Sequence, residues 1–101
     1  MTLRVVAEAE AESFAAAAWY DAQRQGLGTE FLDELSTAFD AIEQNPQRYP
    51  EIPSEGRRQL RKRVLARFPY QVIYQPVGDD VWVLAVAHGR RRPNYWKRRA
   101  R

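Results

Sequence analysis

The chain contains a single histidine, His88, followed seven residues later by Tyr95, and a run of arginines between them begins at Arg90. An imidazole with a pKa of about 6.5 can act as a general acid or base at neutral pH. A nearby arginine can stabilise charge that builds on a phosphate. His88, Tyr95 and Arg90 are therefore candidates for acid–base catalysis at a phosphate group. The alternative is structural, with His88 hydrogen-bonded to a helix layer and Tyr95 and Trp96 packed on a sheet edge.

The composition limits the chemistry further. The sequence has no cysteine and only one histidine, which excludes disulfides and thiolate nucleophiles and leaves no credible metal site. We expect no metal and no cofactor. The sequence has neither a signal-peptide pattern nor an apolar stretch of about 20 residues, so we expect a single cytoplasmic domain over residues 1–101.

Basic residues are concentrated in the second half of the chain. Residues 1–56 carry three arginines against eleven acids, whereas residues 57–101 carry thirteen Lys and Arg against Asp79 and Asp80. This asymmetry favours an anionic partner, either nucleic acid or an acidic protein segment. The candidate binding residues for that partner are Arg61, Lys62, Arg63, Arg67, Arg91 and Arg92. The alternative is that these charges form a solvated face.

The first half predicts a short strand and a helical hairpin. Thr2–Val6 favours a strand, and apolar residues of the next segment recur at helical spacing from Glu8 to Gln25. We expect the stripe of that helix to face the core: Ala11, Phe14, Ala15, Ala18, Trp19 and Ala22. Gly26 ends the helix, and a second helix with Leu32, Leu35, Phe39 and Ile42 runs to Gln44. The hairpin spans residues 8–45, and the glutamates at positions 8, 10 and 12 read as a solvated helix start.

The second half predicts a basic three-strand meander and tail over residues 57–101. A loop rich in proline over residues 45–56 leads to strands near 59–65, 70–75 and 81–88, joined by short turns. The order β-α-α-β-β-β indicates an α+β fold with an antiparallel sheet and the hairpin packed on one face. The other face should be open and polar, and alternation at Arg61, Lys62 and Arg63 places basic groups there.

Several short motifs occur in an order that resembles a known family. They are Ala18-Trp19-Tyr20, Gly26-Leu27-Gly28 with Phe31, Pro46, Tyr49-Pro50, the run from Phe68 to Tyr74, and the run from Val83 to Pro93. In a chain of this length they resemble the RelE/ParE toxins of bacterial type II toxin–antitoxin modules, also called plasmid stabilisation proteins. The resemblance covers nearly the whole chain.

The resemblance implies a growth-inhibiting toxin that is silenced by a cognate antitoxin, whose acidic or amphipathic tail covers the basic surface. It leaves two targets open. One branch of the family cleaves mRNA on the ribosome, and the other poisons DNA gyrase. A decayed module that only binds its antitoxin is a third interpretation.

The residues favour the gyrase branch. Ribosome-dependent relatives use basic residues on the strand after the helices, which Lys62 matches, and a tyrosine beyond the last strand, which Tyr95 matches. They also use two arginines, and at those positions this sequence has Gln71 and Gly89, unless Arg90 or Arg91 substitutes for the second. Other nucleases of the family use a histidine near the end of the last strand, so His88 keeps the nuclease alternative open.

Overall fold

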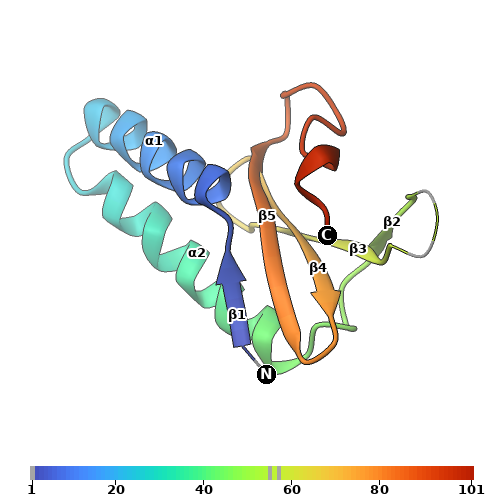
Figure 1. Cartoon of the computed structure of the whole chain (residues 1–101). Coiled ribbons are helices and arrows are strands. Elements are labelled where there is room, and N and C mark those ends of the chain that lie inside the picture. The colour runs from blue at the N-terminus through green and yellow to red at the C-terminus, as the bar shows by residue number, and fades with distance from the viewer. Residues whose placement is uncertain (1, 55, 57) are drawn as a thin grey trace.

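The computed structural model describes residues 2–54, 56 and 58–101 (Figure 1). Arg57, which opens the predicted basic half, lies outside the described residues, as do Met1 and Glu55. The elements in chain order are β1 (Thr2–Val5), α1 (Ala7–Gln23), α2 (Leu27–Gln44), β2 (Glu51–Ile52), β3 (Leu60–Val64), β4 (Tyr70–Val77), β5 (Asp80–His88) and the 3-10 helix η1 (Lys97–Arg99). The predicted α+β class is confirmed. β2 is a two-residue strand inside the predicted loop.

The five strands form one sheet in the order β1-β5-β4-β3-β2. The meander β3-β4-β5 is antiparallel, as predicted. The expectation that the whole sheet is antiparallel is wrong, because β1 pairs with β5 in parallel, with Leu3 opposite Val81. A parallel pair needs a long crossover connection, and the helical hairpin begins that connection.

The hairpin covers one face of the sheet (Figure 1). Phe31 of α2 packs edge-on against Tyr70 of β4, with 5.1 Å between ring centroids. The Tyr74 hydroxyl donates to the Pro46 carbonyl at 2.6 Å, where the chain leaves α2. Because β4 side chains alternate, Tyr70, Val72 and Tyr74 all face the helices. Val72, Tyr74 and Phe31 are completely buried in this core.

The predicted apolar stripe of α1 is wrong in its orientation. The buried positions of α1 are Ala9, Ser13, Ala16, Ala17 and Tyr20. Phe14 and Trp19, the largest members of the predicted stripe, are each 59% exposed. Alanine occurs on every side of this helix, so helical spacing alone selects no face. Close packing between the helices decides which face of α1 is buried. α1 and α2 approach each other closely at Gly28, where an added Cβ would lie 2.8 Å from the Asp21 carboxyl carbon.

The second face of the sheet is covered by the C-terminal segment, residues 89–101. Trp96 is only 4% exposed. The Gln75 side chain bonds to both backbone groups of Arg101, donating to its carbonyl at 3.1 Å and accepting from its N–H at 2.7 Å. The expectation of an open polar face is therefore wrong, because Ile73 and Ala85 on this face are also fully buried.

Neither helix in the described part of the chain is long and apolar enough to cross a membrane. Within the same residues, no group of three or more histidine, cysteine, aspartate or glutamate side chains is arranged to hold a metal ion.

Candidate functional site

Glu12 of α1 lies at the centre of the candidate site. β1 pairs with β5 only as far as Val83, so the outer edge of β5 beyond that residue has unpaired backbone groups. The Glu12 carboxylate accepts the Val86 N–H at 3.0 Å. The Arg99 guanidinium donates to the Leu84 carbonyl at 3.0 Å. These two side chains complete the hydrogen bonding of an edge that the sheet leaves open.

The same carboxylate holds the C-terminal segment. It accepts the Tyr95 hydroxyl at 2.6 Å, the Arg99 guanidinium at 3.0 Å and, at 3.4 Å, that of Arg91. The Glu12 and Arg99 side chains are only 13% and 16% exposed, so this ion pair is largely shielded from water. We call Glu12, Arg91, Tyr95 and Arg99 the Glu12 cluster. The prediction that Glu12 is a solvated glutamate at the helix start is wrong.

Tyr95 is committed to this cluster. Burial, together with the hydrogen bond to Glu12 and the charge of that carboxylate, raises the pKa of Tyr95 to about 12. The Arg91 guanidinium stacks over the Tyr95 ring, 3.8 Å from its centroid. A phenol with so high a pKa is a poor general base, and its proton already points at a carboxylate. The neighbouring Trp96 is only 4% exposed, which confirms the prediction that it packs on the sheet.

His88 ends β5 beside the helices. Its ring packs edge-on against Tyr70, with centroids 5.1 Å apart. Its Nδ1 accepts the backbone N–H of Arg90 at 3.0 Å. His88, Glu12 and Arg91 line one cavity, and Glu12 and Arg91 both contact Tyr95, so the structure brings His88 and Tyr95 to the same corner of the molecule. The Arg90 side chain is exposed and makes no hydrogen bond or ion pair to a described residue.

The basic residues of β3 divide between the two faces of the sheet. Arg61 and Arg63 lie opposite Tyr74 and Val72, which places both on the helix side. The Arg61 side chain is 11% exposed and donates to the Tyr49 carbonyl at 2.6 Å. The expectation that Arg61 and Arg63 lie on an open face is therefore wrong. The chain after α2 returns along this side, and Tyr49 packs there.

Arg63 and the remaining predicted cations have different surroundings. The Arg63 guanidinium lies 4.9 Å from the centroid of the Tyr49 ring. Lys62 lies opposite Ile73, on the side of the C-terminal segment. Arg67 forms an ion pair with Glu30 at 2.8 Å. Arg92 is exposed, and its side chain bonds to none of the residues described. The predicted basic residues thus do not form one continuous site.

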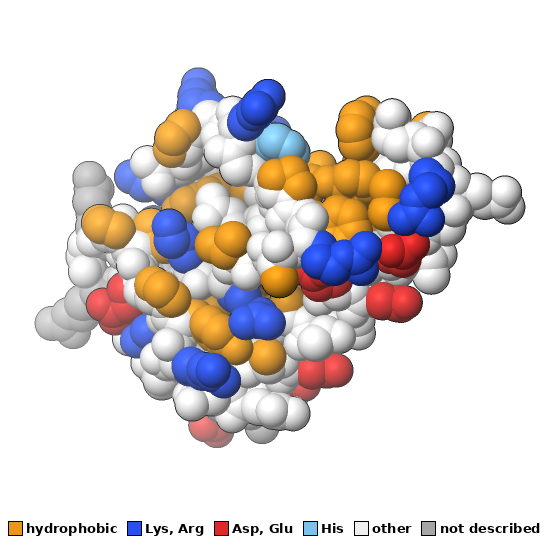
Figure 2. Space-filling model, turned by 180° about the vertical axis from the view of Figure 1, so that it is seen from behind, with side chains coloured by type: hydrophobic (Ala, Val, Ile, Leu, Met, Phe, Trp, Pro, Cys, Tyr) orange, Lys and Arg blue, Asp and Glu red, His pale blue; other side chains and the backbone are white. Residues whose placement is uncertain are grey.

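An apolar groove lies between the exposed face of α1 and the end of β5. One cavity of about 510 Å³ is lined by Trp19, Tyr20, Pro69, Tyr70 and His88. An adjoining cavity of about 260 Å³ shares Trp19, Tyr70 and His88 and extends to Glu12 and Arg91. We call the two together the apolar groove. Figure 2 shows hydrophobic side chains gathered in a hollow beside the histidine. Sequence reasoning placed Trp19 in the core and so missed this surface.

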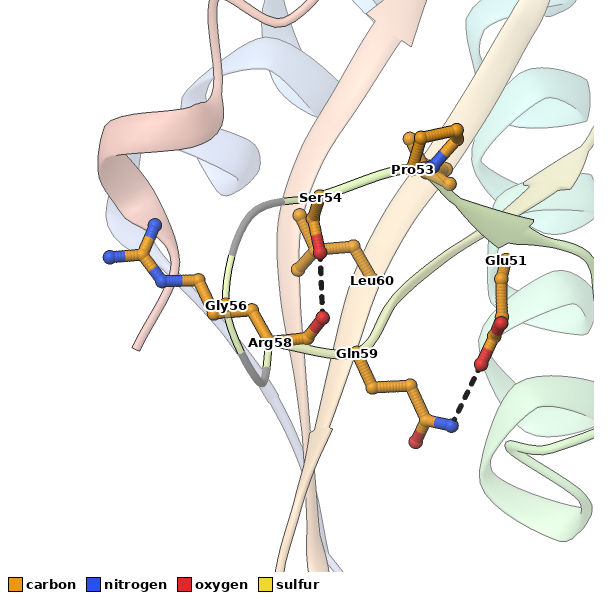
Figure 3. A pocket seen from close by; sticks show the side chains of 8 residues that line it. Glu51, Pro53, Ser54, Gly56, Arg58, Gln59 and Leu60 are labelled. Carbon is orange, nitrogen blue, oxygen red and sulfur yellow. Dashed lines mark hydrogen bonds between the residues drawn. The ribbon is translucent and has the colours of Figure 1, made fainter.

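A third cavity, of about 580 Å³, lies beside β2 and β3 (Figure 3). Its lining combines polar side chains with the apolar Ile52, Pro53 and Leu60. Gln59 donates to Glu51 at 3.0 Å, and Ser54 donates to the Arg58 carbonyl at 2.6 Å. These hydrogen bonds are local to the β2–β3 connection, and none of the predicted catalytic residues lines this cavity.

The family model described as the ParE toxin of type II toxin-antitoxin systems, parDE, matches residues 3–93. The chain belongs to the ParE toxin family. A solved structure titled as the chromosomal ParDE TA system from P. aeruginosa has a similar fold, with a TM-score of 0.75 at 18% identity. That similarity covers 87% of this chain and 95% of the other. A comparison with curated proteins gives no match. The predicted RelE/ParE resemblance is confirmed, and the ParE toxin described here is the toxin of a type II module.

Proposed function

We propose that this ParE toxin inhibits growth by acting on DNA gyrase and that a cognate antitoxin neutralises it. The observation that carries the choice of target is the state of Tyr95. Its hydroxyl donates to Glu12 at 2.6 Å, and its pKa is raised to about 12. RNA cleavage without a metal needs a group that takes the 2′-hydroxyl proton. Tyr95 is poorly suited to that task.

The surroundings of the other nuclease candidates support the same choice. The Nδ1 atom of His88 accepts the Arg90 backbone N–H, and the Arg90 side chain has no hydrogen bond or ion pair to a described residue that would position it. Gln71 and Gly89 stand where the resemblance expects two cations that stabilise charge on the phosphate. The alternative function, cleavage of mRNA on the ribosome, would have to rely on His88 and exposed arginines without a prearranged site.

Purified gyrase provides the direct test of the target. We expect this toxin to stop supercoiling of relaxed plasmid and to leave cleaved DNA with gyrase bound at the breaks. His88→Ala and Tyr95→Phe should retain this effect if they fold, because neither group takes part in phosphodiester chemistry. Full gyrase activity in the presence of folded toxin would contradict the proposal.

We further propose that the antitoxin seats an amphipathic helix in the apolar groove. Trp19 is 59% exposed, although it lies next to Tyr20 of the core, and burial of such a ring by a partner is strongly favourable. Arg91 lines one end of the groove with its side chain 54% exposed, and it suits an acidic residue of the partner helix. Helix-in-groove recognition uses this combination of apolar anchors and charged rim.

Trp19→Ala tests this placement, and Phe14→Ala is its matched control. Both rings are on α1 and equally exposed, but Phe14 lines a separate cavity with Val5, Leu32 and Phe39. We expect Trp19→Ala to weaken antitoxin binding by about 2 kcal/mol or more, roughly 30-fold, because truncation of a central aromatic anchor has this size. Titration calorimetry measures both variants. A loss in Phe14→Ala with none in Trp19→Ala would move the antitoxin to the other cavity.

A further inference from the structure

Four basic residues lie on the side of the molecule away from the helices; Arg58, Lys97 and Arg98 are exposed, and Lys62 is half-buried. Lys62 of β3 lies opposite Ile73 and therefore on the face that the C-terminal segment covers. Lys97 and Arg98 belong to η1 in that segment. Arg58 and Lys97 line one cavity, although they are far apart in sequence. Figure 3 shows the Arg58 side chain extending toward the C-terminal segment. We call these four residues the cationic face.

The side chains of the cationic face lack partners within the described residues. None of the four makes a side-chain hydrogen bond or ion pair to them, and Lys97 and Arg98 are exposed. Several other basic residues are paired, for example Arg4 with Asp80 and Arg24 with Glu30, whereas Arg90 and Arg92 also lack a side-chain hydrogen bond or ion pair within the described residues. A group of like charges without acidic partners creates a local field that attracts a polyanion.

The aromatic residues of the same region restrict the kind of polyanion. Single-stranded nucleic acid is held by bases stacked on exposed rings. Here Trp96 is 4% exposed, and the Arg101 guanidinium stacks over Trp82 at 3.8 Å from the ring centroid. These rings are covered, so the surface offers charge without stacking platforms. A protein partner would in turn favour the apolar groove, which lies beside the helices.

We propose that the cationic face binds the phosphate backbone of duplex DNA without reading its sequence. Lysine and arginine side chains that reach phosphates give such binding its affinity and its salt dependence. The choice of DNA over duplex RNA rests on the proposed function, because gyrase holds duplex DNA. The toxin would then contact the DNA that its target enzyme carries.

Fluorescence anisotropy of a labelled DNA duplex of about 20 base pairs, with the full chain and no gyrase, tests this proposal. With about four phosphate contacts, the association constant should fall about 150-fold between 50 and 200 mM salt. The triple variant Lys62→Gln, Lys97→Gln, Arg98→Gln should bind more than tenfold more weakly at 50 mM. Its constant should fall only about fourfold over the same salt range, since each lost contact reduces the slope by about 0.9.

The matched control is the triple variant Arg4→Gln, Arg24→Gln, Arg48→Gln, which removes the same charge from elsewhere on the surface. It should bind DNA within about threefold of the unmodified chain. Equal losses in the two triple variants would overturn the proposal, because net charge alone would then explain binding. Tighter binding to a duplex RNA, or to an acidic peptide, than to DNA would overturn the choice of ligand.

The gyrase assay separates this proposal from the proposed function. If the toxin binds DNA but leaves gyrase active, the gyrase target is contradicted and the proposal of DNA binding by the cationic face still holds. If the toxin inhibits gyrase but does not bind DNA, the proposal of DNA binding by the cationic face is contradicted and the gyrase target still holds.

Discussion

Replacement of Glu12 by glutamine should destabilise the toxin far more than the same replacement of Glu8 or Glu10 at the start of α1. The substitution removes the negative charge that pairs with Arg99 and leaves that guanidinium, which is 16% exposed, without its carboxylate. Breaking a fully buried ion pair costs about 3–5 kcal/mol. Because the pair is slightly exposed and glutamine keeps one acceptor oxygen, we expect a loss of about 2–3 kcal/mol.

For a domain of this size, that loss corresponds to a fall in Tm of about 8–20 °C. Differential scanning calorimetry measures it, and the matched control is Glu10→Gln. Glu10 is exposed in the first turn of the same helix, so its removal should cost less than about 1 kcal/mol through the helix dipole. Trypsin provides a second readout, since release of the C-terminal segment should speed cleavage after Arg90. Equal Tm values for Glu12→Gln and Glu10→Gln would refute the role of Glu12.

Three further predictions concern packing and charge. Gly28→Ala should cost about 1–3 kcal/mol in chemical denaturation, because its Cβ would meet the Ala17 carbonyl and the carboxyl group of Asp21; an unchanged midpoint would mean that the helices can separate without cost. Arg61→Ala should cost about 2 kcal/mol, whereas Lys62→Ala should stay within about 0.5 kcal/mol, and comparable losses would contradict the assignment of the two residues to different environments. Stability should fall as pH rises from about 10 to 12, because the unfolded state loses the proton of Tyr95 before the folded state does, whose pKa is raised to about 12. Tyr95→Phe should show a shallower fall in denaturant midpoint over that range, and an identical fall would remove Tyr95 as a cause.

The order of elements could be predicted from the sequence because each one carries a local signal. Gly26 lies in the turn between the helices with φ of 90°, a conformation that glycine adopts at little cost, although α1 already ends at Gln23 and Gly26 directly precedes α2. Alternating apolar residues mark β4 and β5. The direction of β1 carried no such signal. A strand that returns to the sheet only after two helices can pair either way, and tertiary contacts decide its orientation.

The face of α1 and the role of Glu12 were harder to predict for a related reason. In an alanine-rich helix the apolar residues fit more than one buried face. The large rings of Phe14 and Trp19 favour a face that is exposed in the structure. A different signal was available, because Glu12 falls three residues after Ala9 and four before Ala16, both of which are buried. A carboxylate beside the buried seam, in a chain with a C-terminal run of arginines, is expected to find a buried partner.

The predicted arrangement of the basic residues on one open face was wrong, because Arg61 and Arg63 lie on the helix side of the sheet. Sequence shows where arginines occur, but it does not show which of them the fold uses. Arg61 supports the returning loop and Arg99 completes the β5 edge, so both serve the fold, whereas the side chains of Lys62 and Lys97 make no hydrogen bond or ion pair to a described residue. Only the register of β3 and the course of the C-terminal segment distinguish these cases.

The most direct test of the proposed target is inducible expression of the toxin in bacteria without its antitoxin. Primer extension maps cellular mRNA, and a parallel assay measures gyrase-linked DNA breaks, for the unmodified chain and for Tyr95→Phe. We expect growth arrest with DNA breaks and intact messages, in both proteins. Codon-phased cuts in translated mRNA that disappear in Tyr95→Phe would contradict the gyrase proposal and make the Glu12 cluster part of a nuclease site.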